Sequence, residues 1–184
     1  MIFKRKAYNK LIEWKDKSRG RATMLIEGAR RIGKSTIVEE FAKNNYKSYV
    51  LIDFSIASDE IKENFWKYII KSWYFFMLLS FETGVPLYQR ESLIIFDEVQ
   101  KYPKAREAIK HLVKDGRYDY TETGSLISIK ENVKDILIPS EEESLTMHPM
   151  DFEKFAEALG VSMFFNKNSG VLQGFWNIFG IYSS

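Results

Sequence analysis

The chain has 184 residues, enough for one well-buried domain and too few for two of ordinary size. Its composition, 45% hydrophobic and 28% charged, is typical of globular proteins, and a net charge of +2 is too small to indicate a nucleic-acid or membrane partner. The lack of cysteine excludes disulfides, thiolate zinc sites and cysteine nucleophiles.

The first part of the chain predicts helices and strands in alternation. Runs with apolar residues at helical spacing predict helices, and short apolar runs free of charge predict buried strands. In chain order these elements are a helix over 4–17, a strand over 22–27, a helix over 36–43 and a strand over 48–54. The strand over 22–27 leads directly into Gly28, which gives the order strand, loop, helix.

A long helix is predicted next. Ser58 is placed to cap its N-terminus, and residues 83–86, which contain glycine and proline, end it. Many of its apolar residues are aromatic, which indicates that other elements cover this helix.

The last predicted elements are a strand over 92–96, a helix from Pro103 to Gly116 and a strand over 117–123. The final strand is weak by propensity because it contains Asp119, Thr121 and Glu122. Alternating strands and helices over some hundred residues predict an α/β fold. Its sheet should be mainly parallel, with helices on both faces.

The composition changes near Gly160, because Lys167 is the only charged residue after it. We therefore predict one domain over residues 1–160, complete or cut short. An atypical apolar tail follows over residues 161–184, and it is either disordered or a product of truncation.

The sequence contains no candidate for a membrane segment. The N-terminus reaches polar residues too soon to form the apolar core of a signal peptide. The most apolar stretch, between Lys71 and Glu82, is too short to span a bilayer. We expect a cytoplasmic protein with no membrane partner.

Residues 28–35 read Gly-Ala-Arg-Arg-Ile-Gly-Lys-Ser and fit the G-x-x-x-x-G-K-[ST] pattern of phosphate-binding loops. The strand before and the helix after are the context that makes this pattern specific. Glycines let successive amides point at phosphate, Lys34 adds a positive charge, and the Ser35 hydroxyl suits Mg²⁺. The predicted nucleotide-binding residues are Gly28, Arg31, Ile32, Gly33, Lys34, Ser35 and Thr36.

Four apolar residues over 93–96 precede Asp97 and Glu98. This pattern places two carboxylates at the C-terminal end of a strand, where ligands bind in open α/β sheets. We expect Asp97 to hold Mg²⁺ through water and Glu98 to orient or deprotonate the attacking water. Two ordinary solvated acids would be the better interpretation of this segment alone, but the phosphate-binding loop favours the functional one.

Residues 1 to about 160 resemble the ATPase domain of an AAA-like prokaryotic family. Its members pair that domain with a C-terminal winged-helix and nuclease-like region. The matching segments are residues 28–36, 94–100, 122–126 and 147–155. The resemblance implies a P-loop NTPase fold of the ASCE/AAA-like type. In that fold we expect the strand before Gly28 and the strand before Asp97 to be neighbours in space.

The resemblance also implies that residues 123–125 are a sensor segment. There the Thr123 hydroxyl would contact the γ-phosphate or the attacking water. A turn capped by a hydroxyl is the alternative. Gln100 is a weaker candidate for reading the γ-phosphate, and no arginine finger is assigned.

Other polar residues are ambiguous or are interpreted as structural. Arg30 and Arg31 are as well explained by solvation as by phosphate contact. His111 and His148 have no partner at metal-ligand spacing and are interpreted as structural. The charge run over residues 141–143 predicts a solvated loop.

Together these motifs predict an ATP-binding and ATP-hydrolysing enzyme that uses Mg²⁺ and acts as a nucleotide-driven switch. The catalytic candidates are Glu98, Lys34 and Thr123, and the metal candidates are Ser35 and Asp97. A truncated nucleotide-binding remnant without turnover and a small-molecule P-loop kinase stay open. A GTPase is disfavoured because no Asn-Lys-x-Asp motif occurs. A homo-oligomer or a protein partner is expected, and DNA only by family analogy.

Overall fold

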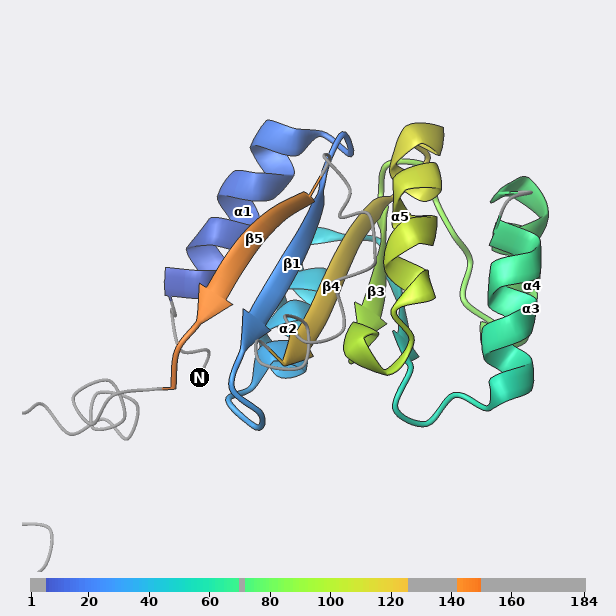
Figure 1. Cartoon of the computed structure of the whole chain (residues 1–184). Coiled ribbons are helices and arrows are strands. Elements are labelled where there is room, and N and C mark those ends of the chain that lie inside the picture. Colours follow the sequence, from blue (N-terminus) through green and yellow to red (C-terminus); the bar gives the residue numbers. More distant parts are fainter. Residues whose placement is uncertain (1–5, 70–71, 126–141, 150–184) are drawn as a thin grey trace, which may run out of the picture. The chain divides into compact units, whose positions relative to one another are not determined.

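The computed structural model describes residues 6–69, 72–125 and 142–149. Up to His148, these residues belong to one compact unit. In chain order (Figure 1) the elements are α1 (Lys6–Ser18), β1 (Thr23–Gly28), α2 (Lys34–Asn45), β2 (Ser48–Asp53), α3 (Asp59–Ile69), α4 (Ser72–Thr83), β3 (Ser92–Asp97), the 3₁₀ turn η1 (Val99–Lys101), α5 (Lys104–Asp115), β4 (Asp119–Ser125) and β5 (Glu142–Met147). The predicted tail over residues 161–184 lies outside the described residues, so the boundary at 160 stays a prediction.

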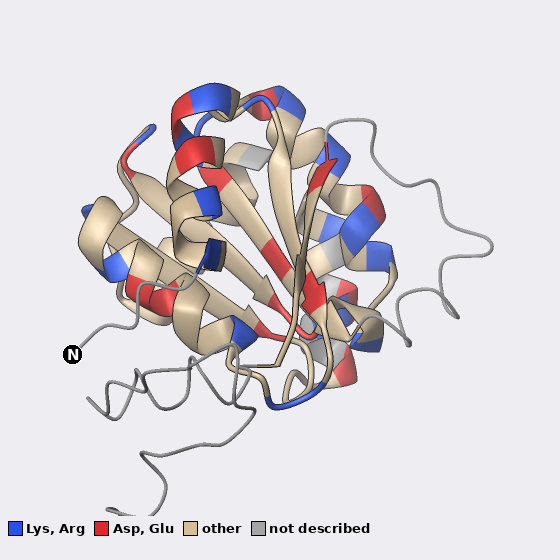
Figure 2. Cartoon of the chain, turned by 90° about the vertical axis from the view of Figure 1, so that its left-hand side faces the viewer, with Lys and Arg blue, Asp and Glu red and all other residues tan. Residues whose placement is uncertain are grey.

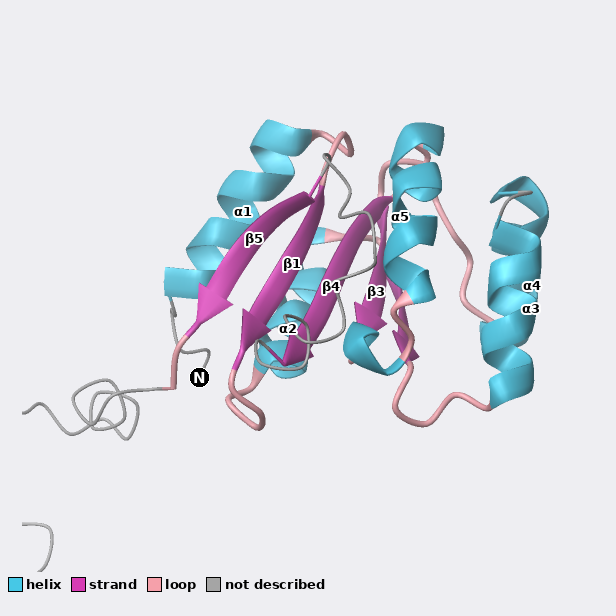
Figure 3. Ribbon diagram, viewed as in Figure 1, coloured by secondary structure: helices cyan, strands magenta, loops and turns pink. Residues whose placement is uncertain are grey.

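The five described strands form one parallel sheet in the order β2-β3-β4-β1-β5 (Figure 3). This arrangement confirms the predicted α/β fold with a mainly parallel sheet. The expectation that β1 and β3 are neighbours is wrong, because β4 lies between them and pairs with both. A strand as polar as β4 can take this central place because its charged side chains find partners inside the protein.

Helices cover both faces of the sheet, as predicted. α1 and α2 pack on one face, and α3, α4 and α5 pack on the other (Figure 1). Along β3, Leu93 and Ile95 belong to the core under α1 and α2, whereas Ile94 and Phe96 belong to the core under the other three helices. Successive side chains of a strand point to opposite faces, so β3 supplies both cores.

The helix predicted from Ser58 to Thr83 is two helices, α3 and α4. The rings of Phe65 and Phe75 lie edge to face with centroids 5.2 Å apart. In one straight helix roughly 15 Å of helix axis would separate them. Two helices bury both rings in one core. The expected cover is incomplete, however, because Trp73 and Phe81 of α4 are exposed.

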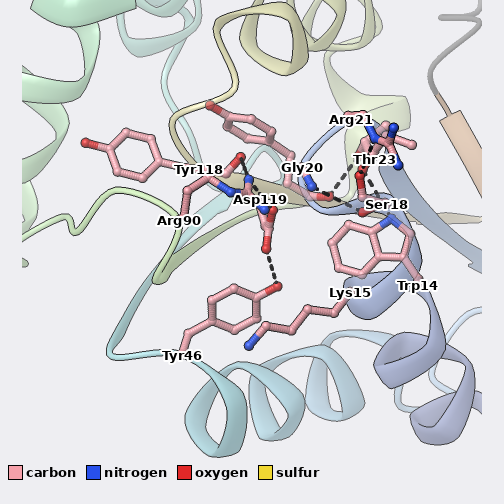
Figure 4. Close-up of polar contacts among 12 residues, drawn as sticks. Trp14, Lys15, Ser18, Gly20, Arg21, Thr23, Tyr46, Arg90, Tyr118 and Asp119 are labelled. Carbon is pink, nitrogen blue, oxygen red and sulfur yellow. Dashed lines mark hydrogen bonds and ion pairs between the residues drawn. The ribbon is translucent and has the colours of Figure 1, made fainter.

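Acidic residues lie on the strands as well as on the helices (Figure 2). Asp119 opens β4 and is buried at the end of the sheet opposite Gly28. Its carboxylate accepts a hydrogen bond from the Tyr46 hydroxyl at 2.8 Å and pairs with the Arg90 guanidinium at 2.7 Å (Figure 4). Burial, followed by the Asp119 charge, raises the pKa of Tyr46, so its hydroxyl stays protonated and donates. The charge of Asp119 is thus compensated inside the protein.

Glu122, in the middle of β4, belongs to a second buried network. Arg106 of α5 donates through Nε to Glu122 at 3.3 Å and through Nη2 to Glu142 of β5 at 2.6 Å. The Thr23 hydroxyl lies 3.4 Å from the Glu122 carboxylate. One guanidinium therefore faces two carboxylates and joins α5, β4 and β5.

The predicted loop over residues 141–143 is wrong for Glu142 and Glu143, which begin β5; residue 141 lies outside the described part of the chain. The Glu142 side chain is only 7% exposed because it pairs with Arg106. The sequence favoured a solvated loop because Arg106, the cationic partner of Glu142, is distant in the sequence.

We expect the stability of the folded protein to fall as pH rises from about 5 to about 8. Burial first, and then repulsion from Glu142, raises the pKa of Glu122 to about 8. The folded chain keeps this proton where the unfolded chain has released it, so in this range the folded state binds more protons and rising pH favours unfolding. Urea unfolding at both pH values measures the effect.

The matched variant for this prediction is Glu122→Gln, which cannot titrate. It should lose less stability than the parent over the same pH range. An equal loss in both proteins would contradict a protonated Glu122.

No helix in the described part of the chain is both long enough and apolar enough to cross a membrane.

Candidate functional site

The carboxyl ends of β1, β4 and β3 lie side by side at one edge of the sheet. Gly28 pairs with Ser125, and the Thr123 side chain contacts Asp97. Three segments that are far apart in the sequence therefore meet there, namely the loop after β1, the end of β4 and the residues after β3. This is the edge at which parallel α/β sheets bind ligands.

The loop after β1 has the backbone of an anion-binding turn. Gly28 has φ +155°, and a Cβ there would overlap the Met147 carbonyl oxygen of β5. Gly33 has φ +84° and precedes α2 without a side-chain cap, so the first amides of α2 keep their donors for another acceptor. Arg31, with φ +62°, is an exposed non-glycine residue in the left-handed region. These turns curve the backbone as phosphate binding requires.

Lys34 is buried and its ammonium group lies inside the curve of this loop. Nζ donates to the carbonyl oxygens of Gly28 at 3.3 Å and Ala29 at 2.7 Å. Burial lowers the pKa of Lys34, an effect that the carboxylates of Glu98 and Asp97 oppose. The charge is therefore held within the loop, facing the two acids.

Three of the predicted residues meet on one carboxylate oxygen. The Ser35 hydroxyl donates to Oδ1 of Asp97 at 2.8 Å, and the Thr123 hydroxyl donates to the same atom. Asp97 and Thr123 are buried and Ser35 is half-buried. Residues 123–125 end strand β4, so the alternative of a hydroxyl-capped turn is wrong. In this structure the Thr123 hydroxyl faces Asp97.

Glu98 follows directly and has a left-handed backbone, with φ 55° and ψ 44°. Its amide donates to Thr123 Oγ1 at 3.4 Å. Its carboxylate accepts a hydrogen bond from Nε2 of Gln100, whose Oε1 accepts from the Ser125 amide at 3.3 Å. The sequence did not predict that Gln100 contacts Glu98, although its position two residues later was the available signal.

The other predicted binding residues bring no side-chain hydrogen bond to this cluster. Ile32 packs against the apolar core under α1 and α2, close to Gly28. The side chains of Arg31 and Thr36 are exposed. Their expected role in nucleotide binding, through the backbone or on contact with ligand, stays a prediction. His111 and His148 are exposed and lie outside this cluster.

Comparisons with known proteins identify a family and a shared fold. A family model described as AAA domain matches residues 20–156. No curated protein matches the chain.

Among solved structures, a chain of Drosophila ORC bound to DNA superposes with a TM-score of 0.52 and 11% identity, over 82% of this chain and 95% of that one. A chain of Drosophila ORC bound to AT-rich DNA and Cdc6 gives a TM-score of 0.52 and 12% identity, over 97% of this chain and 76% of that one. At these identities the two structures show a shared fold, which confirms the predicted fold class.

Proposed function

The chain belongs to the AAA domain family of P-loop ATPase-like domains, and from this premise we propose that it binds ATP with Mg²⁺ and hydrolyses the ATP. The observation that carries the proposal is the meeting of Ser35, Asp97 and Thr123 beside the loop that encloses Lys34. Each of these groups suits a different part of a nucleoside triphosphate.

The loop after β1 would bind the phosphates. Its glycines and the uncapped start of α2 direct backbone amides at an anion, and the helix dipole favours negative charge there. Lys34 would exchange its bonds to two carbonyl oxygens for bonds to phosphate oxygens, which carry full charge and accept more strongly.

The residues present fit a magnesium ion. Mg²⁺ prefers oxygen ligands and usually keeps several waters, with one or two carboxylates and the substrate phosphates completing its shell. The Ser35 hydroxyl and the Asp97 carboxylate supply oxygens 2.8 Å apart. When bound, the ion would neutralise charge on the β- and γ-phosphates.

Glu98 would serve the attacking water. Its carboxylate follows the end of β3, next to Asp97 and in the field of Lys34. As the water oxygen forms its bond to the γ-phosphorus and the bond to the β-phosphate oxygen breaks, Glu98 would orient the water and accept its proton. The Thr123 hydroxyl forms hydrogen bonds with the Asp97 carboxylate and the Glu98 amide. It would thereby hold Asp97 and Glu98 in fixed positions relative to each other.

The proposal also includes a role as a nucleotide-driven switch, a macromolecular partner and a cytoplasmic location. The two ORC structures contain DNA, so DNA is one candidate partner, beside another protein or a second copy. A C-terminal winged-helix and nuclease-like region is an expectation from the sequence resemblance, as is a cytoplasmic location.

Lys34→Ala tests nucleotide binding. We expect ATP affinity to fall by about 10-fold to 100-fold, the value of a hydrogen bond to a charged group. Titration with ATP·Mg²⁺ measures the affinity, and phosphate release from the parent measures turnover.

Lys43→Ala is the matched control for Lys34→Ala, because Lys43 is an exposed lysine in the last turn of the same helix. Equal affinities in the two variants would contradict the binding site. If the parent bound ATP tightly but released no phosphate, the protein would be a nucleotide-binding module without turnover.

A further inference from the structure

Gln100 connects the candidate base to the central strand of the sheet. It lies in η1, two positions after Glu98, and is 6% exposed. Its Nε2 donates to Oε2 of Glu98, and its Oε1 accepts from the backbone amide of Ser125 at the end of β4. A single buried amide thus joins β4 to the Glu98 carboxylate.

Hydrogen-bond chemistry fixes the orientation of this amide. The Ser125 N–H can only donate, so it must face the oxygen of the Gln100 amide. The nitrogen then faces Glu98, whose carboxylate oxygen accepts the hydrogen bond. An isosteric side chain without both a donor and an acceptor cannot make this bridge.

The backbone of Glu98 is held by bonds other than those of Gln100. A non-glycine residue in the left-handed region is strained and persists only where its surroundings hold it. The Lys101 amide donates to the Glu98 carbonyl at 2.8 Å, and the Glu98 amide donates to Thr123. These bonds fix the backbone, whereas the bond from Gln100 fixes the carboxylate itself.

We propose that Gln100 is a positioning residue that aligns the Glu98 carboxylate with the end of β4. This inference rests on the proposed function, in which Glu98 serves the attacking water. Gln100 donates to Oε2, and the proposal assigns the attacking water to Oε1. Because β4 also carries Thr123, a displacement of its end moves the base through Gln100 and moves the Asp97 contact through Thr123.

Gln100→Met tests the proposal in the full chain, because methionine keeps the length and volume but cannot form either bond. We expect kcat for ATP hydrolysis to fall about 10-fold to 100-fold, with ATP affinity unchanged. The matched control is Gln89→Met, the same change at an exposed loop position, which should keep the parent kcat.

A double-mutant cycle separates positioning from a general loss of structure. If Gln100 acts through Glu98, adding Gln100→Met to Glu98→Gln should change the residual rate by less than about twofold. If the two variants multiply their losses, Gln100 acts independently and the proposal is overturned.

The hydrogen bond from the Ser125 amide to Gln100 provides a test that needs no nucleotide. Amide hydrogen exchange at Ser125 should quicken in Gln100→Met and stay slow in Gln89→Met and Glu98→Gln. Unchanged exchange at Ser125 in Gln100→Met would overturn the bridge regardless of any activity.

Gln100→Glu keeps the shape and the acceptor for Ser125 but places a second carboxylate beside Glu98. The Ser125 amide should stay protected while kcat falls as it does in Gln100→Met, because the new carboxylate can accept from Ser125 but cannot donate to Glu98. A Gln100→Glu variant with the parent kcat would overturn the proposal even if Gln100→Met failed to fold.

The outcomes also separate this inference from the proposed function. If the parent protein hydrolysed no ATP, or if Glu98→Gln were fully active, both the proposed function and this inference would be overturned. An inactive Glu98→Gln beside a fully active Gln100→Met would remove the inference alone.

Discussion

Glu98→Gln is expected to lower kcat for ATP hydrolysis by about 10²-fold to 10⁴-fold, the usual contribution of a positioned general base. The amide keeps the size of the side chain and an oxygen that can accept from Gln100, but it cannot take a proton from water. Affinity for ATP·Mg²⁺ should stay within about twofold of the parent, because Lys34 and the loop after β1 are untouched. Phosphate release at saturating ATP and a binding titration measure the two quantities.

Glu82→Gln, on the exposed last turn of α4, is the matched control. It should hydrolyse ATP at the parent rate. If Glu98→Gln did the same, the attacking water would be activated by another group, and the arrangement of Asp97 and Glu98 would have to be explained by metal binding alone.

Arg106→Met is expected to lower the free energy of unfolding by about 3–5 kcal/mol. Arg106 is 2% exposed and holds Glu122 and Glu142 at once, so its removal leaves the negative charge that these two carboxyl groups share without a cation in the interior. This loss is a large part of the 5–15 kcal/mol that stabilises a typical domain. Urea unfolding followed by circular dichroism measures it.

Two further variants show whether an unpaired buried charge causes that loss of stability. Lys10→Met removes an exposed ion pair with Glu13 and should leave the stability almost unchanged. Adding Glu122→Gln and Glu142→Gln to Arg106→Met should recover part of the loss, because neutral amides are cheaper to bury than carboxylates. A loss in Arg106→Met no larger than that in Lys10→Met would show that the network contributes little.

Most of the fold could be predicted from local pattern. The apolar runs that became β1, β2 and β3 and the amphipathic runs that became α1, α2 and α5 each carry their own signal in a few residues. Helix packing on both faces followed from their alternation.

The order of the strands could not be predicted in the same way. The place of β4 between β1 and β3 depends on Asp119 meeting Tyr46 and Arg90, and on Glu122 meeting Arg106. Those partners are distant in the sequence. Strand propensity alone therefore registers only that the polar residues of β4 disfavour a strand. The division into α3 and α4 depends likewise on contact between Phe65 and Phe75.

At the candidate site, the motifs predicted which residues come together but not how their side chains point. Ser35, Asp97 and Thr123 do meet, yet the Thr123 hydroxyl is directed at Asp97, and Lys34 is held by backbone carbonyl oxygens. These orientations depend on competing hydrogen bonds within the folded chain. Their roles on nucleotide stay predictions.

The close approach of Gly28 to the Met147 carbonyl oxygen bears on how the protein is made. Synthesis runs from the N-terminus, so the phosphate-binding loop leaves the ribosome early, while the strand that flanks it leaves late. Until β5 arrives, β1 has an unpaired edge of apolar residues, and such an edge invites pairing with other chains. The growing chain should therefore be most prone to aggregate during this interval, and nucleotide binding should appear only after residue 147 has been released.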